Sequence, residues 1–241
     1  MDAKALEGPR EKVLEIHHRL CRVYGCPVPW FHELDPLSEL VSSLLSHRTR
    51  NADSGAAFKA LRARYPDWNE VIAAPVAEVE AVIRRATWPE QKAPRIQSIL
   101  RAVLAERGEL SLDFLEGMDV TEARSWLERL PGIGPKTSAA VLSFSRLHKP
   151  ALPVDSHHHR VAVRTGLIPA SLSVGPSHKV LAAQLPADWD AQEIYDNHEI
   201  LMIHGQRCCF HQSPTCGRCP ILELCPFGQA RMGRADARRA A

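Results

Sequence analysis

The chain has 241 residues, with 30 Lys and Arg against 28 Asp and Glu, 45% hydrophobic residues and 24% charged residues. This composition is that of a globular protein and excludes collagen-like and disordered chains, and a chain of this length forms one large or two small domains. No apolar run approaches the roughly 20 residues that a bilayer span needs. The first residues, MDAKALEGPREK, are charged where a signal peptide is apolar. We therefore expect a cytoplasmic protein, nucleoid-associated if prokaryotic, with no membrane partner.

The formal net charge of +2 is too small to indicate a nucleic-acid partner, but the charge is unevenly placed. Six arginines and two acidic residues lie between Arg207 and the C-terminus. A basic segment of this kind either faces phosphates or is simply solvated. We expect residues 228–241 to form a disordered basic tail.

Apolar residues recur with helical spacing along the whole chain, as in Leu37, Leu40, Val41, Leu44 and Leu45. No alternating strand pattern competes with this spacing. Helix start signals such as Asp35-Pro36, Gly134-Pro135 and Asp155 agree with it. The sequence predicts an all-α protein with helices near residues 10–24, 37–45, 52–64, 76–86, 96–104, 121–130, 136–147, 156–166, 176–185 and 191–204.

Two proline-rich stretches, residues 26–36 and 147–155, divide the chain. Between them lies a self-contained set of helices, predicted as one domain over residues 37–149. The flanking parts are too short to bury separate cores. We expect residues 1–36 and 150–227 to form a second domain together.

A hairpin between two helices is predicted in LERLPGIGPKTSAAVLSF, where a helix ends at Leu130 and another begins at Pro135. The turn Gly132-Ile133-Gly134 lets the backbone approach a ligand, and the N–H groups of the turn and of the new helix form an anion site. A DNA phosphate fits such a site without base readout. The alternative is a simple corner between two helices.

Lys136 and Asp155 each have a weak signal when taken alone. Lys136 is the second residue of the new helix, where the helix dipole disfavours an ammonium and so favours a nucleophilic amine. A lysine in a first turn is usually just solvated. Asp155 has an equally simple interpretation as the N-cap of the helix that begins SHHHRVAVRTG.

The histidine run His157 to His159 invites a metal hypothesis. Consecutive helical residues point about 100° apart, so these three side chains cannot all face one ion. We expect them to pack or to face phosphates.

Four of the seven cysteines fall within seventeen residues with the spacing C-x6-C-x2-C-x5-C: Cys209, Cys216, Cys219 and Cys225. Without a secretory signal, a metal centre is favoured over a disulfide framework. Zinc and an iron-sulfur cluster both accept four thiolates. The single tight pair with looser arms favours the bulkier cluster, while zinc stays open. Cys21, Cys26 and Cys208 stand outside this spacing and are expected to be buried thiols.

Taken together, LPGIGPKTSAAVL, the LPVDSH segment, His204-Gly205 and the four-cysteine motif resemble the endonuclease III family of DNA glycosylases over about residues 10–227. The resemblance implies a six-helix barrel domain with a helix-hairpin-helix motif, a helical domain with a [4Fe-4S] cluster, and DNA bound in the cleft between them. It implies that Lys136 is the nucleophile, that Asp155 is the catalytic aspartate and that the four cysteines bind the cluster. Gly132, Ile133, Gly134, Lys136, His47, Arg48 and Thr49 are then DNA-binding residues.

The resemblance also implies a reaction. A damaged base, here an oxidised pyrimidine, is flipped out of double-stranded DNA. The Lys136 amine displaces it at C1′, Asp155 stabilises the developing charge, and β-elimination of the Schiff base cleaves the strand 3′ of the abasic site. The expected protein is a monomeric bifunctional glycosylase and abasic-site lyase in base-excision repair.

Three segments depart from the family's pattern. The family's Leu-Ser-x-Gln-Thr-x-Asp run reads LLSHRTRN, with Arg48 for Gln and Asn51 for Asp. In TWPEQKAPRI, Pro89 breaks the helix entry, and the loop 210–215 between the first two motif cysteines lacks the family's basic residues. These departures support an alternative from another class: a DNA-damage-binding or sensing protein with weak or lost catalysis.

Overall fold

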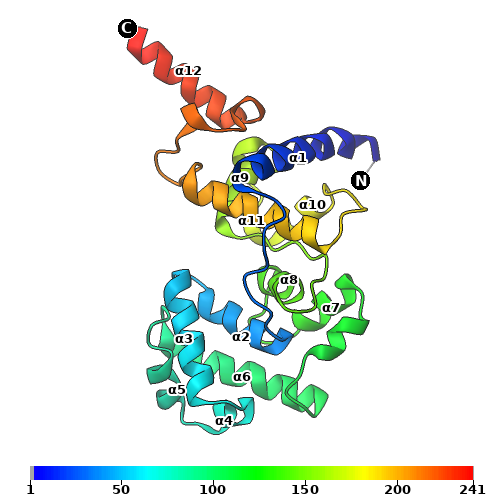
Figure 1. The fold of residues 1–241 in the computed structure, drawn as a ribbon, viewed down its shortest axis with the longest axis vertical. Coiled ribbons are helices and arrows are strands. Elements are labelled where there is room, and N and C mark those ends of the chain that lie inside the picture. Colours follow the sequence, from blue (N-terminus) through cyan, green and yellow to red (C-terminus); the bar gives the residue numbers. More distant parts are fainter. Residues whose placement is uncertain (1–2, 241) are drawn as a thin grey trace. The chain divides into compact units, whose positions relative to one another are not determined.

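The computed structural model describes the backbone of residues 3–240 and the side chains of residues 8–234. Over this part of the chain it contains twelve α-helices, three short 3-10 helices and no strand (Figure 1). The prediction of an all-α protein is therefore confirmed. None of these helices is both long enough and apolar enough to cross a bilayer.

The chain divides into two compact units: Trp30–Lys149, here the central unit, and Met1–Pro29 with Pro150–Ala241, here the terminal unit. The sequence placed the first boundary after residue 36, seven residues later than the structure does. The reason is the aromatic segment at 30–31. Trp30 stacks on His148 with ring centroids 3.9 Å apart, and Phe31 packs edge-on against Phe144 at 5.4 Å.

The central unit is built around α2, whose apolar face is fully buried. Asp35 caps this helix by accepting hydrogen bonds from the N–H groups of Leu37 and Ser38, and Pro36 occupies its first turn, where a missing N–H costs nothing. α2 packs against α8 and α3, and α6 packs against α5 (Figure 1). The unit comprises α2 (Pro36–Ser46), α3 (Asn51–Arg64), α4 (Trp68–Ala73), α5 (Val76–Val82), α6 (Pro89–Arg107), η1 (Asp113–Gly117), α7 (Val120–Leu127) and α8 (Pro135–Phe144).

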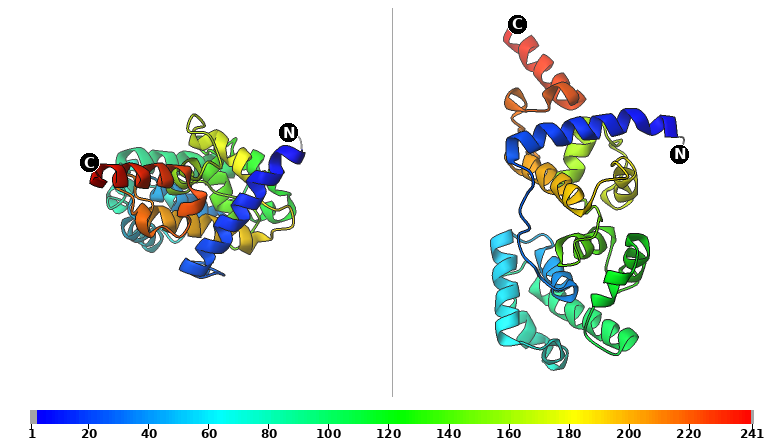
Figure 2. Two further views of the ribbon diagram at one scale, coloured as in Figure 1. Left: turned by 90° about the horizontal axis from the view of Figure 1, so that it is seen from above. Right: turned by 45° about the vertical axis from the view of Figure 1, so that its right-hand side comes forward.

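The terminal unit joins the N-terminal helix to the C-terminal part of the chain, with α1 lying against α11 (Figure 2). Val13, Ile16 and Leu20 of α1 are buried in the same core as residues from α9, α10 and α11. The helices are α1 (Ala3–Tyr24), α9 (Ser156–Thr165), α10 (Val174–Ala182), α11 (Ala191–Arg207), η2 (Cys216–Arg218), η3 (Leu222–Leu224) and α12 (Pro226–Ala240).

A glycine explains the close packing of α9 on α11, two helices that lie side by side in this unit. A Cβ added at Gly205 would lie 2.8 Å from the Cβ of His157 and 3.2 Å from its Cα. Any larger residue at this position would force the two helices apart, so the His204-Gly205 pair has a packing reason.

The C-terminal segment differs from the disordered tail expected from residue 228, because α12 spans Pro226–Ala240. Its start is anchored: the Arg164 guanidinium lies 4.5 Å from the centre of the Phe227 ring, and α12 contacts α9, η2 and η3. The arginine-rich composition suggested a solvated tail, but Pro226 is a good first helical residue and Phe227 supplies an apolar anchor.

Cys21 and Cys26 form a disulfide, so the expectation of two buried thiols is wrong. After α1 ends at Tyr24, Gly25 adopts a φ of +86° and its N–H donates to the Cys21 carbonyl. This turn brings the two Cα atoms to 5.1 Å. The lack of a secretory signal, on which the expectation of free thiols rested, gives no information about this local turn.

Candidate active site and metal centre

The predicted hairpin lies between α7 and α8 in the central unit. Gly132 has a φ of +75°, and the Ile133 N–H donates to the Leu130 carbonyl, which closes the turn. Ile133 is buried and fixes the turn to the unit, whereas Gly132 is exposed. Gly134 is the N-cap of α8 and Pro135 its first residue. The hairpin therefore presents a helix N-terminus at the surface, the geometry that binds an anion.

Lys136, the second residue of α8, lies beside His47 from the end of α2. The His47 Nε2 is 3.2 Å from the hydroxyl of Thr137. Burial, together with the charges of Lys136, Lys92 and Arg95, lowers the pKa of His47 to about 4. His47 is therefore neutral at pH 7, and two of the predicted DNA-binding residues, Lys136 and His47, are brought together by the packing of α2 on α8.

A pocket in the central unit opens next to this pair. Its empty space of about 820 Å³ includes open solvent. Mostly cationic, amide and aromatic side chains line it: Leu44, His47, Arg48, Trp88, Gln91, Lys92 and Arg95. Arg48 and Trp88 both have positive φ, +52° and +55°, which is a strained backbone for a residue with a side chain. The Arg48 guanidinium lies 5.8 Å from the centre of the Trp88 ring. Trp88 is 45% exposed, which leaves an aromatic face available to a ligand.

Lys92 holds the loop that carries His47, Arg48 and Thr49. Its Nζ donates to the carbonyls of Leu45 and His47 and to the Thr49 hydroxyl, at 2.7 to 2.8 Å. The Thr87 N–H also donates to that hydroxyl. Thr49 is thus occupied by contacts within the protein. Sequence reasoning did not identify Lys92, and its only signal was the Lys-Ala pair within TWPEQKAPRI.

Asp155 is the N-cap of α9 in the terminal unit, and its Oδ1 accepts the His158 N–H at 2.7 Å. Burial alone would raise the pKa of Asp155. His198, the hydrogen bond from the His158 backbone, and the other nearby histidines outweigh burial and hold the pKa below its ordinary value. Asp155 is therefore a carboxylate at neutral pH, as electrostatic stabilisation of a cation requires.

A second carboxyl group, Glu199 on α11, accompanies Asp155 and was not predicted. It is 9% exposed, and its Oε1 lies 3.9 Å from the Nε2 of His198. Burial, with the charges of Asp155 and Asp196, raises the pKa of Glu199 to about 7. A partly protonated acid beside an ionised one is common at functional sites. The periodicity of α11 alone could not separate Glu199 from a solvated glutamate.

The three histidines of α9 point to different places. His158 is buried, stacks near His198 with centroids 5.9 Å apart, and has its pKa lowered by burial to about 3. His159 Nε2 is 2.8 Å from the Leu172 carbonyl, and His157 Nδ1 accepts from Arg160. They do not converge on one ion.

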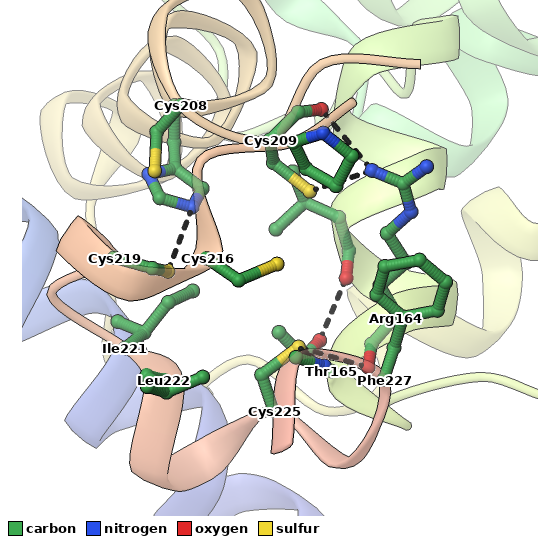
Figure 3. Close-up of a pocket in the computed structure, with 14 residues that line it drawn as sticks. Arg164, Thr165, Cys208, Cys209, Cys216, Cys219, Ile221, Leu222, Cys225 and Phe227 are labelled. Atoms are coloured by element: carbon green, nitrogen blue, oxygen red, sulfur yellow. Dashed lines mark hydrogen bonds between the residues drawn. The ribbon is translucent and has the colours of Figure 1, made fainter. Parts of the chain in front are cut away.

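The four predicted metal-binding cysteines line one pocket in the terminal unit (Figure 3). Cys209 follows α11, Cys216 begins η2, and Cys219 and Cys225 follow η2 and η3. Arg164 donates to the Cys209 sulfur at 3.2 Å, and the Gly228 N–H donates to the Cys225 sulfur at 3.3 Å. Such hydrogen bonds favour the thiolate, the form that binds metal, and act against burial, which raises the pKa of the Cys225 thiol.

The sulfurs of Cys209, Cys216 and Cys225 are directed toward this pocket (Figure 3), whose empty space of about 330 Å³ includes open solvent. A zinc ion bound to four thiolates would hold their sulfurs only about 3.8 Å apart, from bonds of about 2.3 Å. Among the described residues, one group of three ligand atoms lies within 4.8 Å of one another, and it belongs to His204, Cys208 and Cys219. No three of the four motif sulfurs come that close. The four-cysteine set therefore fits a group larger than one ion.

Comparison with known proteins decides the family. Residues 41–185 match the model of the HhH-GPD superfamily of base excision DNA repair proteins. Endonuclease III of Thermotoga maritima is 31% identical over 207 residues, which cover 86% of this chain and 89% of that protein. The chain belongs to the endonuclease III family of base-excision-repair DNA glycosylases.

Further relatives agree with this family. A structure of a trapped endonuclease III–DNA covalent intermediate matches with a TM-score of 0.77 and 28% identity, covering 92% of this chain and 98% of the other. A putative DNA glycosylase of Arabidopsis thaliana is 31% identical over 192 residues, which are 80% of this chain and 64% of that protein. The predicted helix-hairpin-helix glycosylase fold is thereby confirmed. The endonuclease III homologues and the cysteine and histidine cluster together indicate a metal site.

In this endonuclease III homologue, two of the three segments expected to depart from the family's pattern lie close together. Arg48 belongs to LLSHRTRN and Trp88 to TWPEQKAPRI, in which Pro89 begins α6 and does not break it. Arg48 and Trp88 meet at the mouth of the pocket in the central unit. These two side chains therefore bring the two segments together at the pocket.

Proposed function

We propose that this protein is a bifunctional DNA glycosylase and abasic-site lyase that removes oxidised pyrimidines and cleaves the strand 3′ of the abasic site. The proposal depends most on one observation: a member of this family carries a lysine, Lys136, at the start of α8 in the hairpin and an ionised aspartate, Asp155, at the start of α9. A nucleophilic amine together with a carboxylate suffices for both steps of the reaction.

Binding begins with the phosphate backbone. The N–H groups at the hairpin turn and at the start of α8 contact a phosphate, with Gly132 giving the close approach and Ile133 anchoring the turn. The Arg48 and Trp88 side chains at the pocket mouth offer a cation and an aromatic face to an unstacked base. Base flipping costs least where the lesion already weakens pairing.

Chemistry then takes place at the sugar. The Lys136 amine forms a bond to C1′ while the glycosidic bond breaks, and the base leaves after taking up a proton. Asp155 stabilises the positive charge that develops on the sugar. Loss of a proton from the nitrogen and ring opening give a Schiff base. Loss of the C2′ proton then expels the 3′ phosphate oxygen, which cleaves the strand.

We propose that Cys209, Cys216, Cys219 and Cys225 hold a [4Fe-4S] cluster. When bound, the cluster supplies four iron–thiolate bonds that tie the segments after α11 to the rest of the terminal unit, and it takes no part in the glycosidic or lyase steps. Its support is the separation of the four sulfurs, no three of which lie within 4.8 Å of one another, and the hydrogen bonds that Cys209 and Cys225 accept. Pure protein with broad visible absorption and about four irons per chain is the expected result, whereas stoichiometric zinc in iron-rich cells would contradict it.

The proposed partner is double-stranded DNA that contains damaged bases or abasic sites. We propose that the protein acts as a monomer in the cytoplasm, where the chromosome of a prokaryote lies. Sedimentation of the protein alone and with one lesion-bearing duplex tests the stoichiometry, and a complex of two chains per duplex would contradict the monomer.

Borohydride trapping tests the activity. With a duplex that carries an abasic site, the wild-type protein is expected to form a covalent adduct that Lys136→Ala abolishes. Lys59→Ala is the matched control, since Lys59 is an exposed lysine of α3 in the same unit. A covalent adduct formed by Lys136→Ala would show that Lys136 is not the nucleophile.

A second candidate, a damage-binding protein without efficient chemistry, is favoured by Arg48 and by the weakly basic loop at 210–215. For this candidate, the same experiment gives tight binding to the abasic duplex with no adduct in the wild-type protein. A lesion panel that measures base release separately from strand scission then assigns the substrate.

A further inference from the structure

The metal pocket contains two donor groups that the proposed cluster does not use, Cys208 and His204. Cys208 precedes the first predicted ligand in the chain, and His204 lies one helical turn earlier on α11. Both are buried, with exposed fractions of 8% and 1%. Figure 3 shows Cys208 near Cys219, across the pocket from Arg164.

The side chains of His204, Cys208 and Cys219 form a compact set. One nitrogen and two sulfur atoms lie within 4.8 Å of one another, and the Nε2 of His204 is 3.6 Å from the Cys219 sulfur. Zinc bonds of about 2.0 Å to nitrogen and 2.3 Å to sulfur need ligand atoms about 3.5 to 3.8 Å apart. The set therefore closes on a single ion with a movement of less than about 1 Å per ligand atom.

Neighbouring groups orient two of these ligands in the way that metal sites require. The Tyr24 hydroxyl lies 3.0 Å from the Nδ1 of His204, so it can accept the Nδ1 proton and leave the Nε2 lone pair directed at Cys219. The Thr215 hydroxyl donates to the Cys208 sulfur at 3.5 Å, and this contact favours a thiolate. These partners belong to α1 and to the loop before η2, outside the cysteine motif.

We propose that His204, Cys208 and Cys219 form a second metal site, which binds one thiophilic divalent cation such as Zn²⁺ when the cluster is absent. One imidazole and two thiolates suit zinc or cobalt and not magnesium or calcium, which prefer oxygen. The cation displaces one proton from each thiol, and water completes the tetrahedron. Because Cys219 serves both metals, the two occupants exclude each other, and the pocket has an iron state and a zinc state.

The test compares metal content after growth in iron-rich medium and in iron-depleted medium supplemented with zinc. Wild-type protein from the second culture is expected to contain about one zinc per chain, and X-ray absorption should give two sulfur neighbours and at least one nitrogen. Four sulfur neighbours, or protein without zinc, would overturn the proposal.

Two variants separate the sites. Cys208→Ser should keep the iron content of the wild type in iron-rich cells and lose most of the zinc in iron-depleted cells. Cys216→Ser should show the reverse, since Cys216 belongs only to the cluster set. Equal zinc in Cys208→Ser and wild type would overturn the site. If Cys208→Ser fails to fold, the X-ray absorption spectrum of the wild-type zinc form still shows whether the ligands are two sulfurs and a nitrogen. Neither measurement depends on DNA cleavage.

Discussion

The two units place their functional groups in different electrostatic surroundings. The central unit gathers cations around His47 at a pocket that contains no carboxylate, whereas the terminal unit surrounds Asp155 with histidines and a second acid, Glu199. The first set suits a polyanion and the second suits a cationic transition state. Each unit therefore supplies a different half of the proposed reaction, so changes in the two units should have separable effects.

The largest expected effect comes from Asp155→Asn. Asparagine is as good an N-cap as aspartate, so α9 and DNA binding should be kept while the negative charge is lost. Base release should slow by on the order of a hundredfold or more. Single-turnover kinetics with a lesion-bearing duplex measures it. Unchanged base release would show that Asp155 takes no part in the reaction. The proposed difference in role between the two units would then be wrong.

Glu199→Gln should change the pH dependence of stability. The pKa of Glu199 is raised from 4.5 to about 7 in the folded protein, so its contribution to stability is complete below about pH 4.5 and is lost as the pH rises through 7. Glutamine carries no charge at any pH. The variant should gain up to about 3 kcal/mol relative to wild type between pH 4.5 and pH 8.

Denaturant unfolding at the two pH values measures this difference. Glu11→Gln is the control, because Glu11 is an exposed acid of α1 in the same unit. A difference between Glu199→Gln and wild type that is the same at both pH values would show that Glu199 is not an acid of raised pKa.

Lys92→Met should loosen the loop of His47, Arg48 and Thr49. Methionine fills the same volume but leaves the carbonyls of Leu45 and His47 without this donor. The free energy of unfolding should fall by about 1 to 3 kcal/mol. Lys59→Met, on an exposed position, should have no such effect. Equal stability of the two variants would mean that the loop is held by other contacts.

The smallest expected effect is that of Arg48→Ala. A contact of the exposed Arg48 guanidinium with an unstacked base is worth about 0.5 to 1 kcal/mol, so its loss should lower discrimination of damaged from intact duplex about two- to fivefold. Arg62→Ala is a matched control, because Arg62 lies over the ring of Trp68, 4.2 Å from its centre, outside the pocket. The measurement is the ratio of the dissociation constants for intact and for damaged duplex. An unchanged ratio would show that Arg48 takes no part in recognising the lesion.

Local signals predicted the hairpin and ten of the twelve α-helices in the described part of the chain, but not α4 or α12. Asp35-Pro36, Gly134-Pro135 and Asp155 are start signals that act within one turn, and the structure uses each as predicted. The sequence did not predict α12, because the contact of Phe227 with Arg164 joins residues 63 positions apart. The Cys21–Cys26 disulfide was missed although it is local, because cellular context was weighed above the turn at Gly25.

The sequence by itself determined the all-α class, the hairpin, the candidate residues Lys136 and Asp155 and the four-cysteine motif, because spacing along the chain carries this information. Only the tertiary structure placed Lys92 under the loop at 47–49, Glu199 near Asp155, and His204 and Cys208 beside Cys219. These relations depend on which helix faces pack together. Burial and charge act through space, so a pKa or a ligand set is decided only once distant segments meet.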